Sequence, residues 1–111
     1  MNETTASAAR QAEANNRHAV TSGIEAAQVL DNPAFRSAMD ALKADVIATW
    51  KAAPIRDTEG QRILLQLAKL ADKFEAILVG RIEAGKFANS KIEIDDLRAD
   101  NATRRLLRKV L

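Results

Sequence analysis

The chain has 111 residues and a formal net charge of +2, from 17 basic and 15 acidic side chains, which bounds it to a single small domain. The near balance of charge argues against a general polyanion binder, and the absence of cysteine removes disulfides and thiolate sites and fits a reducing compartment. No apolar run reaches the length of a membrane span, and the N-terminal residues lack the apolar centre of a signal peptide. We therefore expect a soluble protein with no membrane partner.

Residues 2–19 are rich in alanine and contain no large apolar side chain. Burial of an alanine methyl removes little area from water, so this segment cannot offset its own ordering entropy by internal packing. The composition predicts an N-terminal extension over residues 1–30 that is disordered in isolation or ordered by a neighbour. A short helix within it is predicted to begin at a capping box formed by Ser22 and Glu25.

A second helix is predicted from Pro33 to about Ala52. Asn32 is a favourable N-cap and proline suits the first helical position, while Pro54 bars continuation at the other end. Large apolar side chains recur along this segment at intervals of 4, 3, 4 and 4 residues, namely Phe35, Met39, Leu42, Val46 and Trp50. Such spacing is typical of a helix that packs against another helix.

A third helix is predicted from a capping box formed by Thr58 and Gln61, with Asp57 as the competing cap. Its end is placed near Ala84, where Gly85 supplies a left-handed C-cap. The helix carries two apolar rows: the first row is Ile63, Leu67, Leu70, Phe74 and Ile77, and the second row is Leu64, Ala71, Leu78 and Ile82. We expect the first row to pair with the preceding helix, since short loops join neighbouring helices. The second row then needs another cover, from the terminal segments of the chain or from another copy.

The pattern changes after residue 88. Alternation at period two from Lys91 to Asp95 indicates a short extended segment, suited to pairing with the edge of another chain. Asp100 or Asn101 is predicted to cap a final short helix. Residues 89–100 carry two basic and four acidic side chains, whereas residues 101–111 carry four basic and no acidic ones, so an acidic segment precedes a basic tip.

Together these patterns predict an all-α protein with three parts. An antiparallel helical hairpin spans residues 31–88, between the N-terminal extension of residues 1–30 and the acidic segment and helical tip of residues 89–111. A two-helix hairpin buries too little apolar surface to be stable alone, so either the terminal segments fold back on it or several copies assemble. Of these we favour an oligomer.

No set of residues predicts catalysis. His18 is the single histidine, without the spacing of a zinc site or the partners of a nucleophilic triad. The acidic side chains from Glu93 to Asp100 lack the loop pattern of a calcium site, and Gly80 and Gly85 lack the strand and lysine of a phosphate-binding loop. We therefore expect no enzyme activity, no cofactor, no metal and no small-molecule substrate.

The basic tip is the one place in the sequence where charge of a single sign is concentrated. Its cations could contact phosphates, yet cations are also favoured at any helix C-terminus, and no aromatic side chain follows Phe87 for base stacking. A solvated helix end or a protein-docking tip is therefore favoured over nucleic-acid binding. We predict partner contacts for apolar positions of the second row and for the C-terminal segment: Leu64, Leu78, Ile82, Ile92, Ile94, Arg104, Arg105, Leu106, Leu107, Arg108, Lys109, Val110 and Leu111.

The chain also resembles a family. The residues that carry the resemblance are Asp31 to Phe35, Trp50, Pro54, Asp57, Glu59, Gly60, Gly85 and Lys86. Through these residues the chain resembles small uncharacterised helical proteins encoded among the morphogenesis and packaging genes of tailed bacteriophages. The resemblance covers about half of the chain. The resemblance implies a protein made in the host cytoplasm, associated with the virion or its assembly, and acting in multiple copies.

Three functions are open at this point. The leading hypothesis is a non-enzymatic phage virion or assembly protein whose helices contact copies of itself or larger phage structural proteins. One alternative is a small-terminase-like DNA-recognition and packaging subunit, although the helix after Asn32 presents Arg36 and Lys43 among acids and makes a poor groove reader. Another is a small helical inhibitor of a host protein, whose acidic segment imitates a phosphate backbone.

Overall fold

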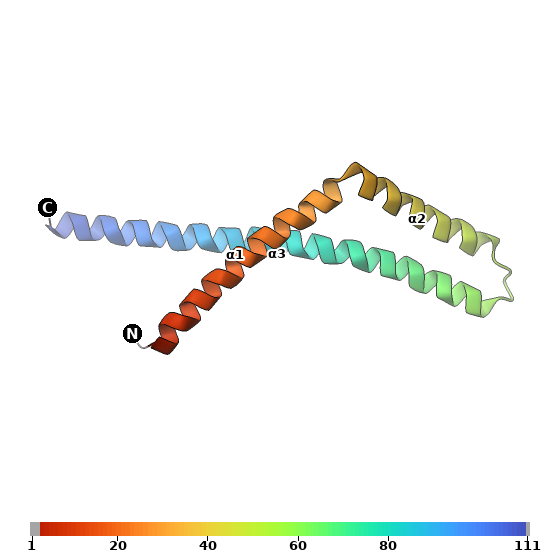
Figure 1. Cartoon of the computed structure of the whole chain (residues 1–111), viewed down its shortest axis with the longest axis horizontal. Coiled ribbons are helices and arrows are strands. Elements are labelled where there is room, and N and C mark those ends of the chain that lie inside the picture. Colours follow the sequence, from red (N-terminus) through yellow and green to blue (C-terminus); the bar gives the residue numbers. More distant parts are fainter. Residues whose placement is uncertain (1–2, 111) are drawn as a thin grey trace. The chain divides into compact units, whose positions relative to one another are not determined.

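The computed structural model describes residues 3–110 of the chain, with the backbone alone for residue 110. Helices α1 (Glu3–Asp31), α2 (Pro33–Ala52) and α3 (Thr58–Val110) account for nearly all of this part, which contains no strand (Figure 1). The protein is therefore all-α, as the sequence predicts. The chain divides into two compact units. The α2 unit comprises Glu25–Gly80, and the crossing unit combines the chain up to Ile24 with the chain from Arg81 onward.

The predicted start and end of α2 are confirmed. The side-chain oxygen of Asn32 accepts hydrogen bonds from the backbone N–H groups of Ala34 (2.9 Å) and Phe35 (3.1 Å), and Pro33 occupies the first turn. These bonds satisfy donors that the first turn of a helix leaves without partners. At the other end the backbone of Ala53 is extended, as the residue before a proline prefers.

The first turn of α3 is capped by Asp57 rather than by Thr58. The Oδ1 atom of Asp57 accepts a hydrogen bond from the backbone N–H of Gly60 at 3.0 Å. Gln61 does not close a capping box, because its side-chain amide donates instead to the carbonyl oxygen of Pro54 at 3.0 Å. The connection between α2 and α3 is thereby tied to the start of α3.

The predicted short helix at Ser22 is wrong, because α1 begins at Glu3 and passes through Ser22 and Glu25 without a break. Alanine, glutamate, glutamine and arginine, which dominate the first half of α1, are strong helix formers. The expectation of disorder or external cover for the N-terminal extension weighed side-chain burial alone and left out this intrinsic preference. Residues 1 and 2 lie outside the described part of the chain.

The predicted end of the third helix is also wrong, because α3 continues through Gly85 to Val110. No glycine in the described part has a positive φ, so Gly85 is not a left-handed cap. The segment from Lys91 to Asp95 is helical rather than extended, and no separate helix begins at Asn101. A glycine costs a helix about 1 kcal/mol relative to alanine and does not stop it, and no proline follows Pro54.

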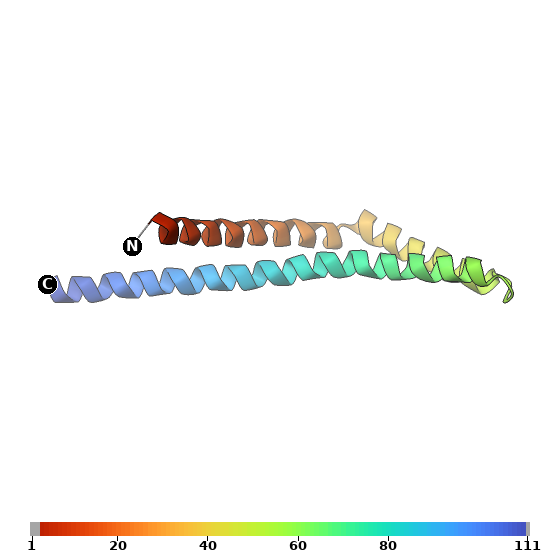
Figure 2. The same ribbon diagram turned by 90° about the horizontal axis from the view of Figure 1, so that it is seen from below.

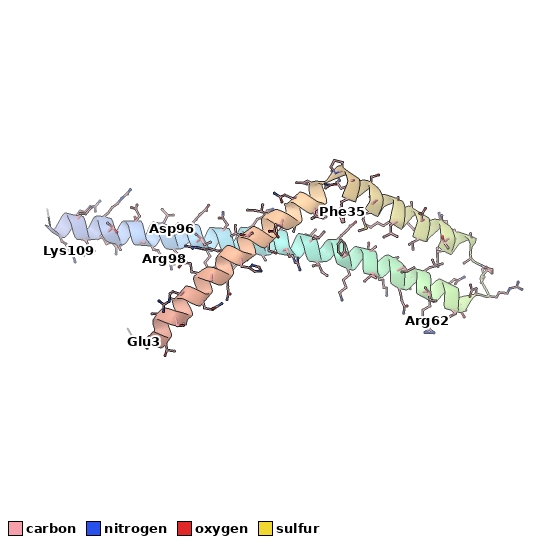
Figure 3. All side chains as sticks on the ribbon, viewed as in Figure 1. Glu3, Phe35, Arg62, Asp96, Arg98 and Lys109 are labelled. Atoms are coloured by element: carbon pink, nitrogen blue, oxygen red, sulfur yellow. The ribbon has the colours of Figure 1, made fainter. Side chains whose placement is uncertain are left out.

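Within the α2 unit, α2 and the first part of α3 run in opposite directions side by side (Figures 1 and 2). The rings of Phe35 and Phe74 lie with their centroids 6.0 Å apart, and Figure 3 shows Phe35 on the side of α2 that faces α3. Val46 and Leu78 are buried in this unit, together with the small side chain of Ala71. Large side chains therefore hold the two helices along several turns.

The structure reverses the predicted roles of the two apolar rows. Leu78 of the second row is 7% exposed, whereas the members of the first row are 46–63% exposed. Both rows have the same spacing, and they lie about 100° apart around the helix, so periodicity alone does not choose between them. The small side chains of Ala68 and Ala71 lie on the face of the second row and permit α2 to approach closely.

The crossing unit is held differently. A Cβ atom added to Gly23 would lie 2.9 Å from the backbone oxygen of Arg81 and 3.1 Å from the Cα atom of Gly85. A Cβ atom on Gly85 would lie 3.0 Å from the backbone oxygen of Ala19. Helices α1 and α3 therefore touch backbone to backbone at this crossing, and away from it they diverge (Figure 1).

Candidate protein-protein interface

The pair of helices in the α2 unit has a groove on each side. One groove is lined only by apolar side chains, namely Met39, Leu42, Leu67, Leu70, Ala71 and Phe74. We call this side, with the complete first row, the apolar face. Every member of its first row is about half exposed. Apolar side chains that recur over about four turns with half of their surface exposed are typical of a surface that binds another protein.

The opposite side of the same pair carries charge, and we call it the ion-pair face. Lys43 and Asp72 line its central groove with Ile47. The Nζ atom of Lys43 donates a hydrogen bond to Oε2 of Glu75 at 2.8 Å and lies 3.7 Å from Oδ1 of Asp72. The hydrogen bond to Glu75 raises the pKa of Lys43 above its usual value, as does the attraction of both carboxylates, against an opposing effect of burial.

The ion-pair face also has an apolar part, close to the connection between the helices. Ile47, Trp50 and Leu65 line a groove there with the half-buried Leu64. Trp50 thus stands at the end of the helix pair, where the sequence places it. The ion pairs and this short groove lie on the same side of the helix pair. Both faces therefore carry apolar groups, and the ion-pair face also carries charged ones.

The last part of α3 is a second exposed surface, which we call the C-terminal arm. Residues 93–109 are all exposed, and the arm presents Ile94, Leu97, Leu106 and Leu107 with about half or more of their surface free. Figure 3 labels Asp96, Arg98 and Lys109 on this arm. Most helical stability in proteins comes from packing of an apolar face, so the arm suits a segment that is stabilised by a partner.

The structure separates the predicted partner-binding residues into groups. Leu78 is buried within the chain itself, which contradicts its proposed contact with a partner, and Leu64, Ile82 and Ile92 are half-buried. The arm brings the remaining described residues together, all of them exposed: Ile94, Arg104, Arg105, Leu106, Leu107, Arg108 and Lys109. Arg104 pairs with Asp100 one turn earlier, at 3.3 Å. The side chain of Val110 and all of Leu111 lie outside the described part.

The sequence interpretation missed the first row as an exposed surface. Leu70 and Phe74 have the spacing of core positions, and the interpretation used that spacing to assign them to the seam. The signal that distinguishes the rows is residue size, since Ala68 and Ala71 mark the side where two backbones approach. The exposed apolar row therefore lies one helical position away from the row that was predicted to contact a partner.

Within residues 3–110, no three histidine, cysteine, aspartate or glutamate side chains gather as a metal site. The described helices include none that is long and apolar enough to cross a membrane. Comparisons with protein-family models, with curated proteins and with solved structures found no match to this chain.

Proposed function

We propose that this protein is a non-enzymatic assembly protein that acts in multiple copies through contacts between helices. The observation that supports this proposal is the half-exposed first row on α3. In the α2 unit the buried apolar side chains are few, whereas five large ones remain open to water on one row of one helix. An unaided two-layer helix pair of this size has little stability to spare, so cover from a further helix stabilises the fold itself.

In this proposal, α2 and the first part of α3 act as an antiparallel hairpin that other copies complete. The C-terminal arm then docks on a neighbouring copy or on a larger structural protein. Its apolar side chains Leu106 and Leu107 supply contact area, and the exposed cations Arg105, Arg108 and Lys109 supply a charged rim. Amphipathic helices that lie in a groove of a partner are a recurrent mode of recognition.

The resemblance of the caps and turns to small phage morphogenesis proteins places this assembly, in our proposal, in a tailed bacteriophage. The protein is then made in the host cytoplasm and associates with the virion or with an assembly intermediate. The partners are copies of itself, larger phage structural proteins, or both. Purification of virions and quantification of this chain within them tests this step independently of the oligomeric state.

Sedimentation equilibrium of the full chain over a concentration series tests the proposal. We expect a mass that is at least twice the chain mass of 12.1 kDa at micromolar concentrations, with helicity retained. A chain that stays at 12.1 kDa throughout the series contradicts assembly in multiple copies.

A small-terminase-like DNA-binding subunit is the second candidate, and the exposed Arg105, Arg108 and Lys109 favour it. Two observations weaken it. Arg104 is already paired with Asp100, and a single residue, Asn32, separates α1 from α2, whereas a helix-turn-helix uses a turn of about 3–4 residues. Gel-shift binding to duplex DNA that weakens steeply with salt would favour this candidate.

A further inference from the structure

The apolar face has a second component, a row of small side chains on α2. Alanine recurs there at positions one or two turns apart, all of them exposed: Ala34, Ala38, Ala41, Ala48 and Ala52. We call these residues the alanine row. Asp45 fills the remaining position of the row and is its single charged member.

The alanine row lies on the same side of the helix pair as the first row. Val46 is buried against α3, while Leu42 lines the apolar groove and Ile47 lines the groove on the opposite side. Since each residue advances about 100° around a helix, Ala38 and Ala41 lie beyond Leu42 and away from Ile47. One face therefore presents bulky side chains on α3 beside small ones on α2.

We propose that a second copy of this chain binds the apolar face, with the first row of each copy packed against the alanine row of the other. This inference rests on the proposed assembly in multiple copies and specifies the surface and the pairing. The two-fold axis then runs parallel to α2 and α3. Each α3 crosses onto the α2 of the other copy in an antiparallel sense, which gives a bundle of four helices.

Side-chain size selects this pairing from the two that a two-fold axis allows. An axis perpendicular to the helices in the plane of the face would set α3 on α3 and α2 on α2. Leu70 and Phe74 would then meet bulky side chains, and alanine would meet alanine across a gap. An axis parallel to the helices sets bulky residues into small ones, which fills space at the density that helix interfaces require.

The area of the face agrees with what a stable dimer needs. Leu42 and the five members of the first row are 46–63% exposed, and half of an aromatic side chain such as Phe74 is about 100 Å², with somewhat less for each leucine or isoleucine. With the alanine row, the face of each copy approaches the roughly 800 Å² per partner that is usual for specific interfaces.

Charge is complementary in the same arrangement. Apart from Asp45, neither row carries a charge. In the proposed pairing Asp45 lies at the level of residue 66 of the second copy, within one turn of Arg62 and Lys69 on its α3. Lys43 and its carboxylates lie on the ion-pair face and stay in water, so the dimer leaves no ion pair to be desolvated.

Two matched substitutions test which face is used. Leu70→Glu places a carboxylate on the apolar face, and Leu65→Glu places one on the opposite side at a similar exposure (63% and 53%). Circular dichroism first establishes that both variants remain helical. By sedimentation, we expect Leu70→Glu to raise the dissociation constant by at least about 30-fold, as the loss of a hot-spot residue does, and Leu65→Glu to leave it within about threefold of the wild-type value.

Disulfide trapping tests the pairing of the rows, because the chain has no cysteine of its own. Leu42 and Leu70 line the same groove, so positions 41 and 70 lie at the same level on the two helices. A mixture of Ala41→Cys and Leu70→Cys chains should form a mixed disulfide on mild oxidation. Leu70→Cys alone should stay reduced.

The outcomes separate this inference from the proposed function. A wild-type chain that is monomeric contradicts both. An oligomer that survives Leu70→Glu, or that is lost equally with Leu65→Glu, contradicts the apolar face alone. A disulfide between two Leu70→Cys chains contradicts the pairing of the first row with the alanine row.

Discussion

The α2 unit and the crossing unit use one helix, α3, in two ways. Between Leu64 and Leu78 the face of α3 toward α2 carries large side chains among small ones, and the two helices stay together for several turns. Around Gly85 the same heptad spacing continues, but glycine and alanine occupy it, and α1 meets α3 where the backbone of Ala19 and Gly23 approaches that of Arg81 and Gly85. Side-chain size along a constant spacing therefore decides whether two helices run together or cross and part.

The largest expected effect comes from the α2 unit. Leu78→Asp places a carboxylate at a buried position, where the charge loses hydration without a partner or takes up a proton. We expect a loss of about 3 kcal/mol or more in the free energy of unfolding, measured by chemical denaturation. Leu67→Asp, at a half-exposed position of the first row, should cost clearly less in a dilute monomeric sample. Equal losses in the two variants would show that the rows are assigned to the wrong faces.

The crossing unit should respond to much smaller changes. Gly23→Ala brings a Cβ atom to 2.9 Å from the backbone oxygen of Arg81, and a backbone atom cannot move aside as a side-chain end can. We expect the variant to be destabilised by about 1 kcal/mol or more, in spite of the better helix propensity of alanine. Gly80→Ala is the control, since a Cβ atom there meets nothing within 4 Å, and it should stabilise α3 by up to about 1 kcal/mol. Opposite signs for the two variants are the result to look for in thermal unfolding.

The ion pair of Lys43 should make a smaller contribution, because about a third of its side chain is exposed and solvent screens the charges. The pKa of Lys43 is raised in the folded chain. Its contribution is therefore fully present below the usual lysine pKa and is lost as the pH rises through the raised value. Lys43→Met should lower the thermal midpoint slightly at neutral pH and match the wild type at strongly alkaline pH. A deficit that is independent of pH would show that packing of the lysine stem, rather than its charge, is responsible.

Removal of residues 101–111 should have no effect on the stability of the α2 unit in a dilute monomeric sample. The described residues of this stretch are exposed throughout, so the truncation removes helix without removing core. We expect lower total ellipticity, by the share of the deleted residues, and an unchanged denaturation midpoint for the α2 unit. A lowered midpoint would mean that the C-terminal arm packs on the rest of the chain.

The sequence predicted some elements well and others poorly, for identifiable reasons. Asn32 with Pro33 and Pro54 defined α2 at both ends, because caps and prolines act through local geometry. Gly85 was over-interpreted as a stop, since a glycine inside a helix is tolerated where another backbone approaches it. The choice between the two apolar rows of α3 depended on contacts with α2, and spacing within α3 carries no information about them.

The sequence predicted that α3 carries an exposed apolar row, but it did not predict which of the two rows is exposed. The sequence shows two apolar rows on this helix, and one neighbouring helix can cover only one of them. The other row therefore needs cover from elsewhere. The assignment to the second row followed from setting the larger side chains of the first row into the seam. Two sequence features help to decide which row of α3 packs against α2. They are the alanines at positions 68 and 71 and the alanine row on α2.

In our proposal the first row of α3 is covered by another copy in solution. The most direct measurement is the accessibility of leucine methyl groups to a soluble paramagnetic probe, by NMR of the full chain at concentrations where it assembles. We predict that the methyl groups of Leu70 and Leu67 are protected while those of Leu65 remain accessible. Methyl groups of Leu70 that are as accessible as those of Leu65, in an assembled sample, would contradict the account.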